Sequence, residues 1–304
     1  MPDSRLLPAL VAPALIFILI GPAPSSAQTG LKVHISADME GITGVVTDAQ
    51  LGPSGFEYQR FREQMTREVL AAIEGARDAG ATRFVIADSH GNGQNLLIEQ
   101  LPEDAEIVRS WPRALGMMAG IDETVDAAVY VGYHASTTSP AGVRAHTLSS
   151  ATLAGVSLNG VEMSEGTLNA AIAGHFGVPV VAMTGDDVAI EEVRAVIGDI
   201  AGAAVKQALG FHSAITLHPT AALSRIREVV RDGLTRRAAL PPYRIEAPIA
   251  LEVRFKNYLP AEVLAYLPIV ERVDAHAIRF VARDMTEVSR FLTFVTNYEP
   301  GLAP

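Results

Sequence analysis

The sequence contains no cysteine, and this absence removes several kinds of protein and site at once. A chain without cysteine has no disulfides, no thiolate metal ligands, no cysteine nucleophile and no lipid anchor on cysteine. Any metal ion must therefore be bound by histidine, aspartate or glutamate side chains.

Clusters of lysine and arginine are also missing from the sequence. The formal net charge of the 304-residue chain is −10, and no basic stripe runs along it. Because nucleic-acid-binding domains concentrate positive charge on one face, we do not expect nucleic acid as a partner. An acidic balance also disfavours binding to an anionic membrane surface.

Only one long hydrophobic run is present, and it lies at the start of the chain. The run Leu6–Ile20 follows a beginning in which Asp3 offsets the charge of Arg5. Small residues at 25–27 provide a cleavage site, and the run is short for a membrane span. We expect residues 1–27 to be a cleaved signal peptide, with a retained membrane anchor as the alternative. Cleavage would leave a periplasmic or secreted chain without a further membrane segment.

The stretch from Leu31 to Val46 combines a strand pattern with an acidic pair. Apolar and polar residues alternate from 31 to 37, which is typical of a β-strand. Asp38 and Glu40 follow directly, and residues two apart point to the same side of an extended chain. Two carboxylates this close repel each other unless a cation or a proton lies between them. The stretch therefore indicates a metal site at the end of a first strand, with a solvated acidic loop as the alternative.

The next segment has the pattern of a βαβ unit. Ser54 and Glu57 have capping-box spacing, and an amphipathic helix continues from there to about Gly80. A buried strand follows at Arg83–Ala87. Strand, helix and strand at this spacing are typical of a parallel sheet. We therefore expect an α/β fold with a mostly parallel sheet and helices on both of its faces.

Further strands continue this pattern beyond residue 120. Ala127–Val131 and Val178–Met183 are apolar runs of strand length, and Asn159-Gly160 is a strong hairpin signal. Ser164 can cap the next helix, which places Glu165 at its first position.

The sequence changes character near residue 215. A basic amphipathic helix at Pro219–Ala239 is followed by strand-like segments and by a last helix that Asp284 can cap. Few candidate catalytic groups occur in this half of the chain. We therefore expect two domains, a metal-binding catalytic α/β domain at 28–215 and a smaller α/β domain, with oligomerisation as a candidate role, at 216–304.

Polar side chains follow several of the predicted strands at the point where each strand ends. Asp38 and Glu40 follow the first strand, His90 follows the second, and His134 follows a later one. In open parallel sheets, ligands bind outside the carboxyl ends of the strands, so we expect these side chains to meet there. Glu165 adds a third carboxylate at a helix start. Two histidines and three carboxylates are enough for two divalent cations, for which zinc fits best and cobalt or manganese are alternatives.

A series of motifs in this order resembles the DppA-type zinc D-aminopeptidases. The motifs are SADMEGITGVV, IADSHGNGQNL, VGYHAST, SEGTLNAAIAG, VVAMTGDD and AAVKQ, followed by RFKNYLPAE and ARDMTE in the second half. The resemblance covers nearly everything from residue 31 onward. It implies a binuclear zinc peptidase that removes amino-terminal residues from short peptides, D-alanyl ones in the best-known member.

The resemblance also implies roles for individual residues. The family's metal ligands match five positions: Asp38 as the bridge, Glu40 and His90 at one zinc, and His134 and Glu165 at the other. His146 matches the family's proposed catalytic nucleophile or base. The resemblance further implies a homo-oligomer, in the form of a ring-shaped decamer of two-domain subunits.

Other polar residues have both a structural and a functional interpretation. Asp186 or Asp187 is a candidate to hold the substrate amine, and a loop or helix cap is the alternative. Asp88 is expected either to orient the neighbouring histidine or to cap its turn. Lys206 is a candidate for the substrate site or an oligomer contact, and we expect His34, on a strand face, to be structural.

Together these features predict a secreted or periplasmic binuclear-zinc aminopeptidase. Its expected substrates are short peptides with an amino-terminal D-amino acid, such as D-Ala-D-Ala. A metal-dependent amidohydrolase or an L-selective peptidase on the same scaffold is the first alternative. A periplasmic solute-binding protein with two α/β domains is the more distant one, because such a protein needs no clustered histidines and carboxylates.

Overall fold

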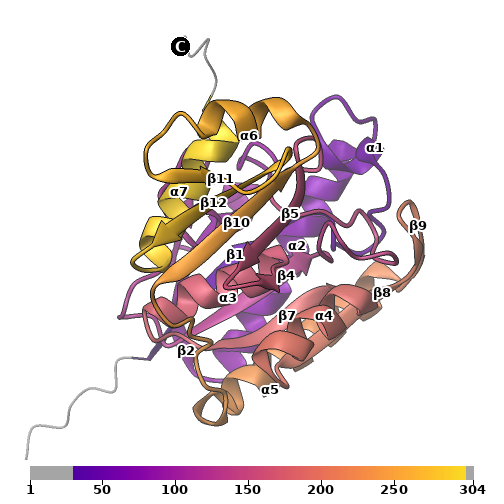
Figure 1. Cartoon of the computed structure of the whole chain (residues 1–304). Coiled ribbons are helices and arrows are strands. Elements are labelled where there is room, and N and C mark those ends of the chain that lie inside the picture. The colour runs from indigo at the N-terminus through magenta and orange to yellow at the C-terminus, as the bar shows by residue number, and fades with distance from the viewer. Residues whose placement is uncertain (1–29, 299–304) are drawn as a thin grey trace, which may run out of the picture.

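The computed structural model describes residues 30–298, and two β-sheets organise them (Figure 1). The predicted signal peptide at 1–27 lies outside the described residues. Within the described part, no helix is both long enough and apolar enough to cross a bilayer.

The larger sheet has seven strands in the order β3-β2-β1-β4-β7-β8-β9. Its strands are β1 (Leu31–Ala37), β2 (Ala81–Asp88), β3 (Ala105–Val108), β4 (Ala127–Tyr133), β7 (Val180–Asp186), β8 (Ala201–Gly210) and β9 (Ser213–Thr216). Every neighbouring pair is parallel except β8 and β9, which form an antiparallel edge. The predicted α/β fold with a mostly parallel sheet is confirmed.

The second sheet has five antiparallel strands in the order β11-β12-β10-β5-β6. Its strands are β5 (Leu153–Leu158), β6 (Val161–Glu162), β10 (Ile249–Phe255), β11 (Val270–Arg272) and β12 (Ala277–Ala282). The predicted hairpin turn joins β5 to β6, and both of its central residues, Asn159 and Gly160, have positive φ. Positive φ at both central residues is what a two-residue β-hairpin turn of type I′ requires.

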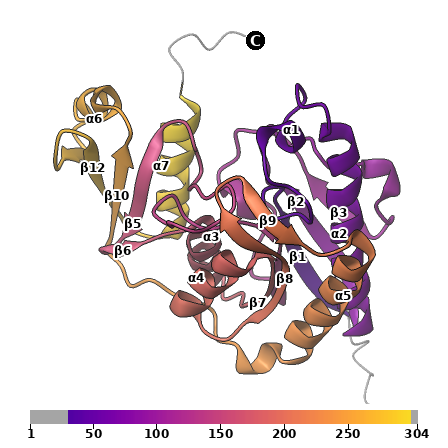
Figure 2. The ribbon, with the colours of Figure 1, turned by 90° about the vertical axis from the view of Figure 1, so that its right-hand side faces the viewer.

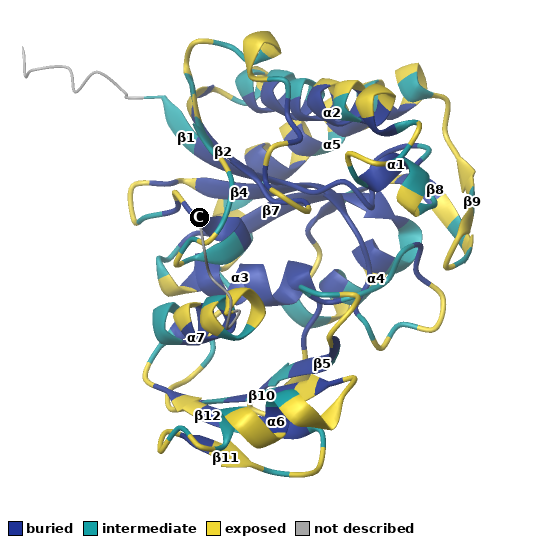
Figure 3. Cartoon of the chain, turned by 90° about the horizontal axis from the view of Figure 1, so that it is seen from above, coloured by how far each residue is buried: buried dark blue, intermediate teal, exposed yellow. Residues whose placement is uncertain are grey.

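The helices cover both faces of the larger sheet, as predicted (Figure 3). The helices are α1 (Asp48–Leu51), α2 (Tyr58–Asp78), α3 (Glu165–His175), α4 (Asp187–Ile197), α5 (Pro219–Thr235), α6 (Tyr258–Leu264) and α7 (Met285–Asn297). On one face α2 packs with α5, and on the other lie α3 and α4. The capping box predicted at Ser54 is wrong: α2 begins later, after Glu57, whereas Gln50 accepts a hydrogen bond from the Thr47 backbone N–H at the start of α1.

Helix α3 lies between the two sheets, with α7 beside it (Figures 2 and 3). All residues from Glu165 to Gly174 are buried, so α3 has no solvent-facing side. A helix that is buried all round lacks an amphipathic pattern, which agrees with the run of small and apolar residues in its sequence. Ser164 caps this helix by accepting a hydrogen bond from the Thr167 backbone N–H, as predicted.

The boundary predicted near residue 215 does not separate the two sheets. Helix α5, which follows that boundary, buries its apolar face against α2, β7 and β8 of the larger sheet. The β5–β6 hairpin, which precedes the boundary, belongs to the second sheet because β5 pairs with β10. Both elements have one apolar face, and the chain crosses between the sheets to bury each of them. The part around the second sheet is therefore built from two separate stretches of sequence.

Candidate metal centre

Main-chain hydrogen bonds continue beyond the ends of three adjacent strands and hold their loops together. Asp38 N donates to Val131 O at 2.8 Å, and Ser89 N donates to Ala37 O at 2.8 Å. Gly41 N donates to Gly132 O at 2.7 Å. This crossing point is so tight that a Cβ on Gly41 would lie 2.1 Å from the Tyr133 carbonyl oxygen. The carboxyl ends of β1, β2 and β4 therefore meet at one place.

The six residues predicted for the site come together there in two groups. One group contains Asp38, Glu40 and His90, and the other contains His134, His146 and Glu165. Within each group, one potential ligand atom per residue lies within 4.8 Å of the others. Five of the six side chains are buried and His146 is partly buried. Each group could hold a metal ion.

Asp38 lies between the two groups and faces both. Its Oδ1 is 3.3 Å from Nδ1 of His90, which is also 2.8 Å from Oε2 of Glu40. Its Oδ2 is 3.2 Å from Nε2 of His134, which is 3.3 Å from Oε2 of Glu165. This is the position of a carboxylate that bridges two cations.

The three histidines share one hydrogen-bonding arrangement. Each places one ring nitrogen next to a backbone carbonyl and the other toward the carboxylates. The carbonyl contacts are His90 Nε2 to Leu51 at 2.6 Å, His134 Nδ1 to Ala135 at 3.0 Å, and His146 Nδ1 to Arg144 at 2.9 Å. Because a carbonyl only accepts hydrogen bonds, the nitrogen beside it must carry the proton. The nitrogen that faces the carboxylates is then the one available to a metal, which is the usual arrangement of metal-binding histidines.

The charges of the site are strongly coupled. Burial and the neighbouring Glu40 raise the pKa of Asp38. Burial would also raise the pKa of Glu40, but His90 outweighs it and lowers that pKa well below its usual range. Burial alone would lower the pKa of His90 and of His134, but the adjacent carboxylates raise both pKa values well above normal. The carboxylates thus need positive charge beside them, which divalent cations supply when they displace the histidine protons.

Two buried atoms at the centre of the site have no hydrogen-bond partner. They are Asp38 Oδ2 and His134 Nε2, which face each other at 3.2 Å. A buried polar atom without a partner is costly, and native proteins rarely leave one unexplained. A cation bound by both atoms would satisfy them. Imidazole nitrogens with carboxylate oxygens are a donor set that suits zinc.

Within the second group, His146 comes from a loop, whereas His134 follows the end of a strand. Its ring stacks on His134 with centroids 4.1 Å apart and an interplanar angle of 8°. Its Nε2 is 3.7 Å from Oε1 of Glu165, and its backbone N–H donates to Ala135 O. The free nitrogen of His146 is therefore positioned to exchange a proton or to reach a metal held by its neighbours.

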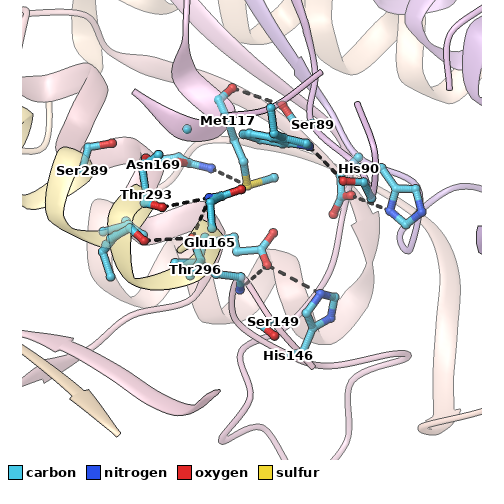
Figure 4. A pocket seen from close by; sticks show the side chains of 18 of the residues that line it. Ser89, His90, Met117, His146, Ser149, Glu165, Asn169, Ser289, Thr293 and Thr296 are labelled. Atoms are coloured by element: carbon cyan, nitrogen blue, oxygen red, sulfur yellow. Dashed lines mark hydrogen bonds and ion pairs between the residues drawn. The ribbon is translucent and has the colours of Figure 1, made fainter. Parts of the chain in front are cut away.

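A cavity of about 410 Å³ opens onto both groups (Figure 4). Its lining includes the side of α3 that carries Asn169 and, next to it, a polar side of α7 with Ser289, Thr293 and Thr296. Among the described residues that line the cavity, the charged or titratable ones are those of the metal groups, and no lysine or arginine is included. The sequence reasoning missed the α7 wall. The spacing of its three hydroxyls, four and then three residues apart, is a signal of a shared helix face.

The other candidate residues have structural positions. Asp88 caps the turn after β2 by accepting from Leu96 N at 2.8 Å, and the Leu51 carbonyl, which sequence reasoning missed, orients His90 instead. Asp186 is fully buried as the cap of α4, and Asp187 accepts from the backbone of β8. Neither lines the cavity.

Residues 31–294 match the family model described as D-aminopeptidase, peptidase family M55. The chain is 31% identical over 271 residues to the D-aminopeptidase of Bacillus subtilis strain 168, covering 88% of this chain and 97% of that protein. Its fold is similar to the solved structure of the zinc-dependent D-aminopeptidase DppA from Bacillus subtilis, a self-compartmentalizing protease. The TM-score is 0.84 at 30% identity, with 88% and 97% of the two chains covered.

Proposed function

The chain belongs to the D-aminopeptidase family, and from this premise we propose that it is a binuclear-zinc aminopeptidase acting on short peptides such as D-Ala-D-Ala. The family and the enzyme class predicted from the sequence are thereby confirmed. The observation that carries the proposal is the pair of buried ligand groups on either side of Asp38, at one end of a cavity of about 410 Å³. A solute-binding protein has no need of such groups.

Asp38, Glu40 and His90 would hold one zinc ion, and His134 and Glu165 would hold the other with Asp38 as the bridge. When bound, the zinc ions would polarise the scissile carbonyl and acidify a water molecule. The charged groups of the cavity all lie at this end. A substrate amine held at this end, by a metal or a carboxylate, would place the first peptide bond beside the metals.

We assign the proton transfers to His146. Its Nδ1–H is held by the Arg144 carbonyl, so Nε2 is the nitrogen free to accept a proton from the attacking nucleophile. The same nitrogen can then return the proton to the departing amine, as general acid–base catalysis requires. The stacked ring of His134 fixes the orientation of His146 during both steps.

The proposal includes a location and an assembly. The amino-terminal pattern supports a periplasmic or secreted enzyme. Exposed large apolar side chains support a homo-oligomer, with a decameric ring as the expected form. Two groups of them lie on or just after α6 and on the β8–β9 hairpin: Tyr258, Leu259, Val263 and Tyr266, and Leu209, Phe211 and Ile215.

The test compares hydrolysis of D-Ala-D-Ala and L-Ala-L-Ala by the purified mature protein, with metal content measured before and after chelation. We expect cleavage of the D-dipeptide, loss of activity with the metal, and recovery when zinc is restored. His146→Ala should be inactive with about two metals still bound per chain, and His175→Ala, at an exposed position, is the matched control.

Three outcomes would contradict parts of the proposal. Cleavage of only the L-dipeptide, or of amides but not peptides, would replace the substrate and keep the site. Loss of one metal from His146→Ala would make His146 a ligand rather than a proton carrier. Protein that binds no metal and cleaves nothing would overturn the enzyme and favour a binding protein.

A further inference from the structure

The segment that carries Asp38 and Glu40 is a buried turn rather than an exposed loop. Residues 38–43 and Val45 are buried, so their backbone groups need partners within the protein. Ile42 N and Val45 N donate within the turn, to Met39 O and Ile42 O. The carbonyls of Glu40, Ile42 and Val45 also share one hydrogen-bond donor outside the turn, and Ile42 O accepts from it in addition to Val45 N.

Lys206 is that donor. It belongs to β8, and β4 and β7 lie between β8 and the first strand in the sheet. Its ammonium donates to the carbonyls of Glu40, Ile42 (3.2 Å) and Val45 (2.7 Å). An ammonium has three N–H groups, so all of its donors are used on this turn. The side chain is only 2% exposed and does not line the cavity.

Glu68 binds the same turn through a different backbone group. It projects from α2, and its Oε1 accepts hydrogen bonds from Thr43 N at 3.0 Å and from Gln64 Nε2 at 2.9 Å. Glu68 is fully buried. A buried ammonium group thus holds three carbonyls of the turn, and a buried carboxyl group holds one of its N–H groups.

We propose that Lys206 and Glu68 are positioning residues that fix the turn after β1 so that Glu40 reaches the metal it shares with Asp38 and His90. The carbonyl of Glu40 itself is one of the three that Lys206 holds, so the bond acts directly on the backbone of a candidate ligand. His134 follows β4 and Glu165 begins α3, and neither forms a hydrogen bond or ion pair with Lys206 or Glu68. The proposal rests on the proposed metal site and predicts that the two zinc positions respond differently.

Lys206→Met keeps most of the length of the side chain and removes the three hydrogen bonds. Loss of a group that supports a ligand typically weakens metal binding by about 10–100-fold. We expect this loss of affinity for the zinc at Glu40 and His90, while the zinc at His134 and Glu165 keeps its affinity. Lys32→Met is the matched control, because Lys32 pairs with Asp122 and Thr124 near the surface.

Glu68 provides a second, conservative pair of variants. Glu68→Gln retains an oxygen that can accept from Thr43 N, whereas Glu68→Leu does not. We expect Glu68→Leu to weaken the same single zinc and Glu68→Gln to bind both zinc ions as the unmodified protein does. This pair tests the proposal even where Lys206→Met fails to fold.

The experiment titrates zinc into the metal-free proteins against a chromophoric chelator and measures bound metal after gel filtration. Thermal unfolding is recorded in parallel. Selective loss of one zinc in Lys206→Met and Glu68→Leu supports the proposal. Equal loss of both ions, or two unchanged affinities, overturns it. If the unmodified protein binds no zinc, the proposed function fails as well, so the two failures are distinguishable.

Discussion

His34 should make this protein lose stability in mild acid. The residue lies on the face of β1 that is turned away from α2, and it is fully buried. Its Nε2 donates to Ala119 O at 3.1 Å, while its Nδ1 is buried without a partner. A second proton would therefore add an unpaired N–H and a charge to an apolar region. Burial accordingly lowers the pKa of His34 from 6.5 to about 4.

The size of the effect follows from this pKa. Above pH 6.5 the ring is neutral in both the folded and the unfolded chain, and His34 costs nothing. As the pH falls from 6.5 toward 4, His34 becomes protonated in the unfolded chain but stays neutral in the folded chain. The free energy of unfolding then drops by about 2 kcal/mol at pH 5 and by about 3 kcal/mol at pH 4.

His34→Gln isolates this contribution. Glutamine can still donate to the Ala119 carbonyl but does not titrate. We would measure urea unfolding of both proteins at pH 7.5, 6 and 5 with the same zinc concentration. The metal-site histidines and carboxylates titrate in both proteins, so their effects cancel in the difference. The unmodified protein should lose about 2 kcal/mol more than the variant between pH 7.5 and pH 5. Parallel losses would refute the reasoning.

Two further predictions concern the cavity and its tightest turn. Gly41→Ala would put a Cβ 2.1 Å from Tyr133 O, so zinc content and melting temperature should both fall. The control is Gly52→Ala, whose Cβ would meet no atom within 4 Å and should change neither quantity. Ser289→Leu on α7 should raise KM for a D-alanyl tripeptide by about tenfold through lost space, with zinc content unchanged. An unaltered KM would mean that the substrate does not reach the α7 wall; Ser224→Leu, at an exposed position of α5, is its control.

The location of the candidate site could be predicted because it depends on local sequence. Asp38, His90 and His134 each come directly after or at the end of an apolar strand, and parallel strands bring such positions to one edge. Strand periodicity and helix caps are also local, which is why Ser164 and Asp284 begin their helices as predicted.

Long-range packing could not be predicted in the same way. An apolar helix face shows that something covers it, but the sequence of α5 does not say which sheet does so. Strand β8 was missed because its small residues, in AGAAVKQALG, show little alternation. The carbonyls of Leu51 and Arg144 orient histidines through the backbone, so their side chains give no signal. The role of Lys206 depends on a contact with residues more than 160 positions earlier.

The proposed ligands come from positions spread between residue 38 and residue 165, and they follow three different strands or begin a helix. No short piece of the chain contains more than three of them, so the site exists only after β1, β2 and β4 have paired. Metal binding of this kind is coupled to folding, and an unfolded chain holds no catalytic metal pair. A chain in which β1, β2 and β4 have not yet paired therefore lacks the complete ligand set, so the proposed metal site depends on completed folding.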